Sequence, residues 1–309
     1  MPRIPDDWAK IPVVAKRLEL SVKKKSEPEI ISIHSWKRLP WLVHGFSTRR
    51  GGFSTIYGES ALNLGFTKDD SPTAVRRNRV AFLDALGKGS GLASWPLVTL
   101  RQTHSDLIHL VDQPPAFPLV GDGLVTEVPR ILLAVQTADC LPVILVDRKT
   151  HAIGIFHAGW RGTVKRIVEK GVGELRRWFG TQPRNLLAAI GPAIHACCYE
   201  VGEEVRDKFH SQFAYARQLF RESQESDEIR QKYPLLFMTA RAPGHSDLTQ
   251  KIFLDLVEAN RQQLLTAGVP RDSITASELC TCCNRGLLFS YRAERGRTGR
   301  MMAVAGIKN

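Results

Sequence analysis

Three residues with chemically versatile side chains each follow an apolar stretch of the sequence. Cys140 ends TADC just after ILLAVQ (131–136), His157 follows AIGIF (152–156), and His104 lies in RQTHSD after VTLRQ. A single cysteine beside LPVILV is more often a small buried hydrophobe than a nucleophile. Three such residues at the ends of three predicted strands form a candidate reactive site.

Two imidazoles and one thiolate suit Zn²⁺, and three protein ligands leave a fourth position for water or substrate. The sequence therefore predicts His104, Cys140 and His157 as metal ligands and as the catalytic centre. The three are separated by 35 and 16 residues, which is not a local zinc-finger spacing. One copper ion is an alternative by ligand type. A multicopper oxidase is disfavoured, because the nine histidines include no H-x-H pair.

Two glycine-rich segments could bind an anion. HAGWRG links a predicted strand to a predicted helix, where backbone N–H groups and Arg161 could face a phosphate. TRRGG (48–52) places two arginines beside a flexible turn. Each segment could equally be an ordinary solvated turn.

The order of predicted strands and helices along the chain predicts an α/β fold, a layered sandwich of mixed β-sheets flanked by helices. Residues 1–38 read as an N-terminal extension and 39–309 as a single domain. Helices are expected from Ser71-Pro72 to Gly87, at 163–179, and from Asp247 to about Gly268. A glycine-rich turn is expected at 51–52 and a surface excursion at 215–245. Strands are expected at 41–48, 97–102, 107–111, 131–136, 142–146, 152–156, 186–191, 287–291 and 301–307.

Composition narrows the class of protein. The 309 residues are 43% hydrophobic and 24% charged, as in soluble globular proteins. No apolar run reaches the roughly 18 residues of a membrane span, and MPRIPDDWAK is unlike a signal peptide, so a cytoplasmic location is expected. The net charge of +12 favours anionic partners such as phosphorylated metabolites. Its distribution argues against a dedicated nucleic-acid arm.

Five further cysteines lie at positions 197, 198, 280, 282 and 283. Cys280 and Cys283 form a C-x-x-C, which Cys197 and Cys198 could complete as a four-cysteine zinc site. Adjacent cysteines project differently, however, and C-T-C-C lacks an open knuckle. We expect buried thiols without metal, and a structural metal remains the alternative.

Taken in order, several motifs resemble the laccase-domain purine nucleoside phosphorylase family, whose members were earlier described as multicopper polyphenol oxidases. The resemblance runs from about residue 41 onward, and TADCLPV with HAGWRG is its most specific part. The motifs are TRRGG, ALNLG, QTH, GDG, TADCLPV, HAGWRG, IGPAI..CCYEVG and LLFSYR...TGRM.

The resemblance implies a fold similar to the deamidase of cytotoxic necrotising factors. It also implies a catalytic zinc on His104, Cys140 and His157. The implied activities are phosphorolysis of adenosine, inosine and methylthioadenosine, and deamination of adenosine, so the expected partners are purine nucleosides and phosphate. Implied substrate-binding residues are Arg49 of TRRGG, Asn63 of ALNLG and Arg161 of HAGWRG.

Several alternatives stay open at this point. Asp139 is a candidate proton donor to the leaving base. His195 replaces the glycine usual in IGPAIG and could alter the rim of the site. The competing functions are a copper-dependent polyphenol oxidase, a non-catalytic metal-binding protein, and a metal-free hydrolase in which Cys140 is the nucleophile and His157 its base. The hydrolase would not need His104.

Overall fold

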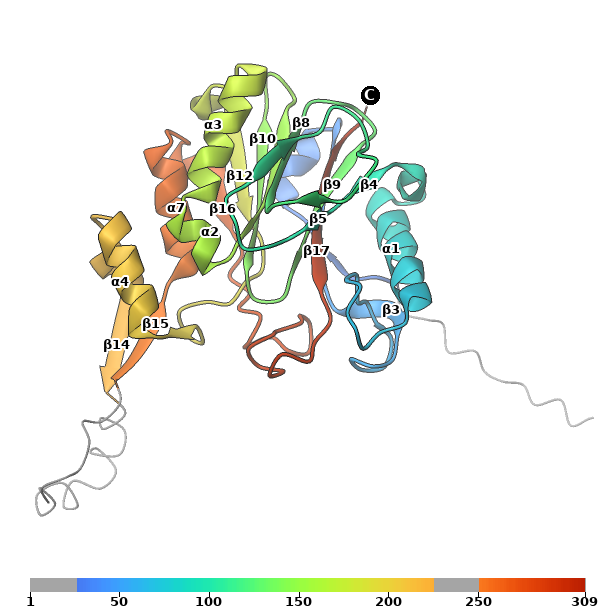
Figure 1. Cartoon of the computed structure of the whole chain (residues 1–309). Helices are drawn as coiled ribbons and strands as arrows, with labels where there is room; N and C mark the ends of the chain where they lie inside the picture. The colour runs from blue at the N-terminus through green and yellow to red at the C-terminus, as the bar shows by residue number, and fades with distance from the viewer. Residues whose placement is uncertain (1–26, 225–249, 309) are drawn as a thin grey trace, which may run out of the picture.

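Two β-sheets lie face to face at the centre of the protein, and helices cover their outer faces (Figure 1). The computed structural model describes residues 27–224 and 250–308. The first sheet has the strand order β1 (Ile30–Ile31), β2 (Leu42–Ser47), β17 (Met301–Ile307), β9 (Leu132–Thr137) and β4 (Leu97–Val98). The second has the order β16 (Ile274–Ala276), β12 (Leu186–Ile190), β10 (Leu141–Asp147), β11 (Ile153–Ala158), β8 (Gly123–Thr126) and β6 (Ile108–Leu110). Both sheets mix parallel and antiparallel pairs, so the predicted fold class is confirmed.

Smaller elements surround the two sheets. A three-stranded sheet consists of β13 (Glu200–Val201), β15 (Gln250–Leu254) and β14 (Phe220–Gln224), and β5 (Leu100–Arg101) pairs with β7 (Leu119–Val120). The α-helices described are α1 (Pro72–Gly87), α2 (Trp160–Val164), α3 (Ile167–Phe179), α4 (Glu203–Gln212) and α7 (Leu256–Thr266). The 3₁₀ turns in the described residues are η1 (His34–Arg38), η2 (Leu92–Ser94), η3 (Pro183–Asn185), η4 (Ala216–Leu219) and η5 (Arg271–Ser273).

The alternation of side chains along β10 explains the layers. Leu141, Val143 and Leu145 pack into the core beneath α3 and α7, whereas Ile144 and Val146 face the first sheet. Successive side chains of a strand point to opposite faces, so a continuous apolar strand needs cover on both sides. On the far face of the first sheet, α1 packs against β17 and β2. The layers therefore run helix, sheet, sheet, helices.

The long apolar strands were predicted correctly. Those at 41–48, 131–136, 142–146, 152–156, 186–191 and 301–307 correspond to β2, β9, β10, β11, β12 and β17. The expected strand at 97–102 is instead two short strands in different sheets, β4 and β5, and β6 takes up part of 107–111. Helix α1 begins after Ser71 with a proline in its first turn and ends at Gly87, as predicted.

Two predicted helices differ from the structure. The expected helix 163–179 is two helices, because Arg166 adopts a left-handed conformation (φ 63°) between α2 and α3. The helix expected from Asp247 begins only at Leu256, where Asp255 caps the backbone N–H of Glu258 at 2.8 Å. Residues 250–254 form β15, and the burial of residues 251–254 alternates with the period of a strand. Asp247 itself lies outside the described residues.

Two further predictions were wrong, one of a strand and one of a turn. The expected strand 287–291 is a series of turns, in which the N–H groups of Leu287 and Leu288 donate to the Asn284 carbonyl. The glycine pair expected as a turn lies instead in β3 (Arg50–Ser54). Gly52 is required there because a Cβ would lie 2.2 Å from the Ala61 carbonyl oxygen.

The described parts of the expected extension and of the surface excursion have regular structure. Ile30–Ile31 pairs with β2, and Trp36 of η1 is 2% exposed, so residues 27–38 pack on the sheet. In the segment 215–245, η4 and β14 are described, and β14 pairs with β15. Residues 1–26 and 225–249 lie outside the described part.

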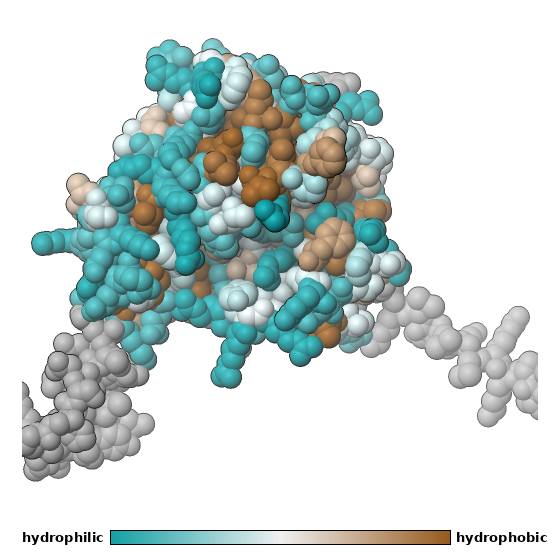
Figure 2. Space-filling view, viewed as in Figure 1, coloured by the Kyte–Doolittle hydropathy of each residue, from teal (hydrophilic) through white to brown (hydrophobic). Residues whose placement is uncertain are grey.

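The surface is largely hydrophilic on the face shown in Figure 2, with apolar side chains gathered in its upper half. Exposed apolar residues include Leu107 and Phe117, on the segment between β5 and β7. Among the described helices, none combines the length and apolar character needed to cross a membrane.

His44 gives the packed N-terminal segment a predicted pH dependence. Its Nε2 accepts a hydrogen bond from the Ile33 N–H at 3.0 Å, and its ring lies 4.9 Å from that of Trp36. Burial lowers the pKa of His44 from 6.5 to about 4. Because the folded pKa lies below the unfolded value, this contribution to stability is present above pH 6.5 and is lost as the pH falls towards 4.

We expect the free energy of unfolding to fall between pH 6.5 and 4 by up to about 3 kcal/mol more in the unmodified protein than in His44→Gln. Denaturant titrations across this pH range provide the measurement. His34→Gln, on the exposed face of the same segment, is the matched control and should retain the full decline. Identical profiles for all three proteins would contradict this role of His44.

Candidate functional site

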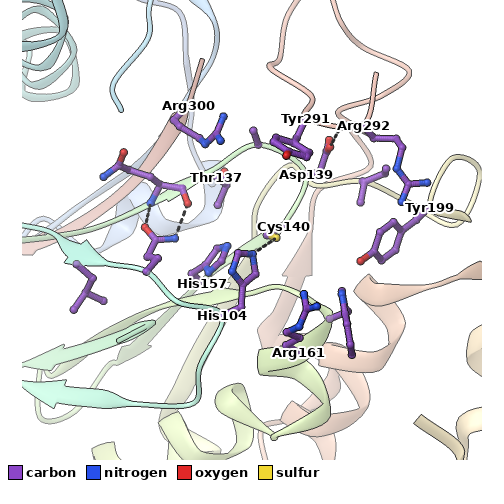
Figure 3. Close-up of a pocket in the computed structure, with 16 residues that line it drawn as sticks. His104, Thr137, Asp139, Cys140, His157, Arg161, Tyr199, Tyr291, Arg292 and Arg300 are labelled. Atoms are coloured by element: carbon purple, nitrogen blue, oxygen red, sulfur yellow. Dashed lines mark hydrogen bonds between the residues drawn. The ribbon is translucent and has the colours of Figure 1, made fainter. Parts of the chain in front are cut away.

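The ends of three strands bring the predicted ligands together. In the antiparallel pair of β10 and β11, Leu141 lies opposite Ala158, so Cys140 at the start of β10 is beside His157 near the end of β11. His104 follows β5 and reaches the same point. One donor atom from each of the three residues lies within 4.8 Å of the others, and Cys140 Sγ is 3.8 Å from His104 Nε2 (Figure 3).

The carboxylate of Asp122 orients both histidines. It accepts a hydrogen bond from His157 Nδ1 at 2.7 Å and others from the backbone N–H groups of His104 (3.1 Å) and Ser105 (2.6 Å). Burial opposes its ionisation, but these hydrogen bonds hold the Asp122 pKa well below its usual range. With Nδ1 of His157 occupied, its Nε2 is the ring nitrogen left to bind a metal. A carboxylate behind a histidine ligand is a common feature of metal sites.

The Cys140 thiolate and the His157 imidazolium stabilise each other. Burial disfavours the Cys140 thiolate, but His157 and His104 outweigh it and lower the pKa of Cys140 to about 6. Burial likewise disfavours the imidazolium, but Cys140 and Asp122 raise the pKa of His157 to about 9. The thiolate, which is the form that binds metals, is thus accessible at neutral pH.

Asp139 holds the backbone beside the thiol in an uncommon conformation. Its φ is 92°, a left-handed value that a residue other than glycine adopts only under constraint. Its two carboxylate oxygens accept hydrogen bonds from Thr281 Oγ1 and from the Arg292 N–H, each at 2.6 Å, and its carbonyl accepts from the Ile194 N–H. These contacts give Asp139 a positioning role, and its role as proton donor to the leaving base stays a prediction.

A pocket of about 580 Å³ opens over the three ligands, within the usual range for small-molecule sites. Arg161 and Arg292 lie near Tyr199 on one side of Cys140, and Arg300 lies on the other (Figure 3). The remaining lining residues are Leu100, Gln102, His104, Gln136, Thr137, Ala138, Asp139, Cys140, His157, Trp160, Ile194 and Tyr291. The pocket therefore combines aromatic surface with three guanidinium groups.

Of the three predicted substrate-binding residues, only Arg161 lines this pocket. The Arg49 guanidinium instead donates to the carbonyls of Arg285 (2.7 Å) and Tyr57 (2.6 Å) and to Glu294 (3.0 Å).

Asn63 is fully buried and likewise lies outside the pocket lining. It bonds Asp70 through its amide nitrogen, and its Oδ1 accepts from the Arg300 N–H at 2.8 Å. The geometry thus gives both Arg49 and Asn63 supporting roles, because their polar groups are already paired. His195 also lies outside the lining, although its neighbour Ile194 contributes to it.

The second cysteine cluster differs from the prediction. Cys197, Cys198, Cys280 and Cys283 each bring a sulfur to within 4.8 Å of the other three. Cys280 is buried, but Cys197 and Cys283 are exposed, so these are not uniformly buried thiols. The adjacent cysteines converge because the turn after His195 bends the chain, with the N–H groups of Cys198 and Tyr199 both donating to the His195 carbonyl.

Sequence reasoning also missed Asp122, Tyr199, Arg292 and Arg300. All four lie in motifs that carry the family resemblance, namely GDG, CCYEVG, LLFSYR and TGRM. The motifs were therefore the available signal, but their contacts with residues far away in the sequence were not visible.

Comparison with known proteins gives consistent matches over most of the chain. A family model described as multi-copper polyphenol oxidoreductase laccase matches residues 43–308. The purine nucleoside phosphorylase YlmD of Geobacillus stearothermophilus is 36% identical over 274 residues, covering 85% of this chain and 89% of that protein. A protein from an unknown prokaryotic organism, named adenosine deaminase RL5, is 34% identical and covers 84% of this chain and 91% of its own length. The crystal structure of the Bacillus licheniformis hypothetical protein YfiH matches with a TM-score of 0.75 and 34% identity, covering 91% of this chain and 97% of that one.

Asp122→Asn should weaken metal binding at the three-residue centre by about 10- to 100-fold, because the amide cannot orient both histidines. Competition with a chromophoric chelator measures the affinity. Asp106→Asn is the matched control, since Asp106 pairs with Lys170 and Lys165 away from the ligands. Equal affinities in Asp122→Asn and the unmodified protein would show that the carboxylate does not act through the histidines.

Proposed function

This chain belongs to the multi-copper polyphenol oxidoreductase laccase family, and from that premise we propose that it is a zinc-dependent purine nucleoside phosphorylase that also deaminates adenosine. The proposed nucleoside substrates are adenosine, inosine and methylthioadenosine, and phosphate is the second substrate. The observation that carries the proposal is the cluster of His104, Cys140 and His157 at the base of an arginine-lined pocket.

The donor set favours zinc over a multicopper centre. Two histidines oriented by a carboxylate, together with one thiolate, fit a tetrahedral zinc with one position left for substrate or water. Within residues 27–224 and 250–308, only one of the two His/Cys clusters contains histidine. A laccase needs several coppers with many imidazole ligands. Bound zinc would supply a Lewis acid at the open position.

Phosphorolysis requires an anion site beside the nucleoside. An oxygen of phosphate forms the bond to C1′ of the ribose as the bond from C1′ to the base breaks, and the base leaves with the electron pair and takes up a proton. Arg161 and Arg292 line the pocket, and neither forms a salt bridge with an acidic residue of the described chain. We assign phosphate to these two guanidinium groups.

Tyr199 lies beside the two arginines of the proposed phosphate site, on the same side of Cys140 (Figure 3). Burial and the neighbouring Cys140 thiolate raise its pKa, so the phenol keeps its proton. It can therefore donate a hydrogen bond to phosphate or to the purine.

A second candidate function is a metal-free hydrolase. The thiolate of Cys140 beside the imidazolium of His157 is the arrangement of a cysteine nucleophile with its base. His104, placed 3.8 Å from the same sulfur, favours the metal.

The metal assignment predicts that purified protein converts adenosine and phosphate to adenine and ribose 1-phosphate, and that Cys140→Ser loses zinc from this centre. Phosphorolysis should fall by at least about 100-fold, because the Lewis acid is lost with its ligand. Product chromatography and metal analysis of the same samples test both points. Restoration of activity when zinc is returned to chelator-treated protein supports the assignment. Full phosphorolysis by metal-free protein would contradict the metal assignment.

The phosphate assignment predicts that Arg161→Gln raises the KM for phosphate by about 10- to 100-fold, the equivalent of one charged hydrogen bond. Adenosine deamination should change much less, because phosphate takes no part in it. Arg176→Gln removes the same charge from an exposed position on α3 and should leave both rates unchanged. Equal losses of both activities in Arg161→Gln would place Arg161 on the nucleoside instead.

A further inference from the structure

The four-cysteine cluster lies outside the pocket lining and has no role in the proposed chemistry. Its sulfurs come from two segments more than 80 residues apart in the sequence, Cys197 and Cys198 after β12 and Cys280 and Cys283 after β16. Cys283 Sγ lies 3.6 Å from that of Cys197 and 3.4 Å from that of Cys198. All four atoms lie within 4.8 Å of one another.

These distances fit a shared metal better than a covalent bond. A disulfide requires about 2.05 Å between sulfurs, and all six cysteines are free. Four sulfurs arranged tetrahedrally at about 2.3 Å from zinc are about 3.8 Å apart. The separations of 3.4 and 3.6 Å are close to that value and none exceeds 4.8 Å, so small movements of the side chains around an ion are sufficient.

We propose that Cys197, Cys198, Cys280 and Cys283 bind a second zinc ion as a closed structural site. Four thiolates complete the tetrahedron and leave no position for substrate, which distinguishes a structural zinc from a catalytic one. Cys280 and Cys283 have the C-x-x-C spacing that recurs in such sites. Because Cys197 and Cys283 are exposed, an ion can enter from solvent.

Main-chain contacts join the two segments that carry the cluster. These contacts are the bridge between Ala193 and Cys280 and the hydrogen bond that the Thr281 N–H donates to the Ala193 carbonyl at 2.9 Å. The cluster is therefore held by main-chain contacts on both sides.

The proposed zinc ion would stabilise the wall of the pocket beside Cys140. Ile194 and Thr281, each next to a bridge residue, hold Asp139 through its carbonyl and its carboxylate. Tyr199, one residue after Cys198, lines the pocket. A zinc ion joining the two segments would thus fix the pocket wall beside Cys140 without contacting substrate.

Metal analysis of the full chain tests the proposal. We expect about two zinc ions per chain in the unmodified protein and one in Cys283→Ser. Cys282→Ser is the matched control, since Cys282 is adjacent in sequence but outside the cluster, and it should retain both ions. Cys140→Ser should also lose one ion, so failure of the first centre and failure of the second are distinguishable.

A spectroscopic measurement avoids dependence on the folding of cluster variants. Cys140→Ser keeps all four cysteines of the cluster, and when its zinc is replaced by Co²⁺ it should bind one cobalt. That cobalt should show the intense thiolate-to-cobalt absorption of four sulfur ligands. A single zinc in the unmodified protein that Cys140→Ser removes would overturn the proposal. Cobalt absorption without thiolate bands in Cys140→Ser would overturn it as well.

Discussion

The buried carboxylate of Asp122 is the interaction on which the site depends. It accepts hydrogen bonds from the His157 ring and from the backbone of the segment that carries His104, so one group orients one imidazole directly and fixes the backbone that carries the other. Burying a carboxylate is costly unless all of its lone pairs find donors. The ring nitrogen and N–H groups around Asp122 supply them, aided by the Ser105 hydroxyl at 2.6 Å. The hydrogen bonds that offset the cost of burying this carboxylate also make the centre rigid, at the point where we propose that a metal binds.

A second set of hydrogen bonds surrounds this centre. Arg49 and Asn63 pair with the loop that follows β16 and with the Arg300 backbone, and Asp139 is fixed from two distant segments. Asp139 lines the pocket and Arg49 and Asn63 do not, yet all three hold segments that form its wall. Misplacement of reacting groups by about 1 Å is costly in catalysis. Motif residues that do not touch substrate can thus be as necessary as those that do.

Much of the fold and the centre of the site could be predicted from the sequence, and the failures have physical causes. Strands β10, β11 and β17 are apolar on both faces, so their pattern is continuous and unambiguous. Cys140 and His157 could be predicted as candidate metal ligands because each lies at the end of such a strand, whereas only the two-residue strand β5 precedes His104. Residues 250–254 (QKIFL) were misassigned because a short segment with three apolar residues before a true helix fits either period. The convergence of Cys197 and Cys198 depends on a turn at His195 that spacing does not reveal.

The placement of β17 has a consequence for the order of folding. This strand lies between β2 and β9 in the first sheet, although it follows both by a long stretch of chain. On a ribosome, β2 and β9 therefore emerge long before the strand that separates them, and each exposes an edge meanwhile. Closing so many distant contacts is slow, because the entropy of long loops is lost before the contacts stabilise the chain. The nascent protein is thus exposed to mispairing of β2 with β9, and chaperones that shield strand edges would have their greatest effect in that interval.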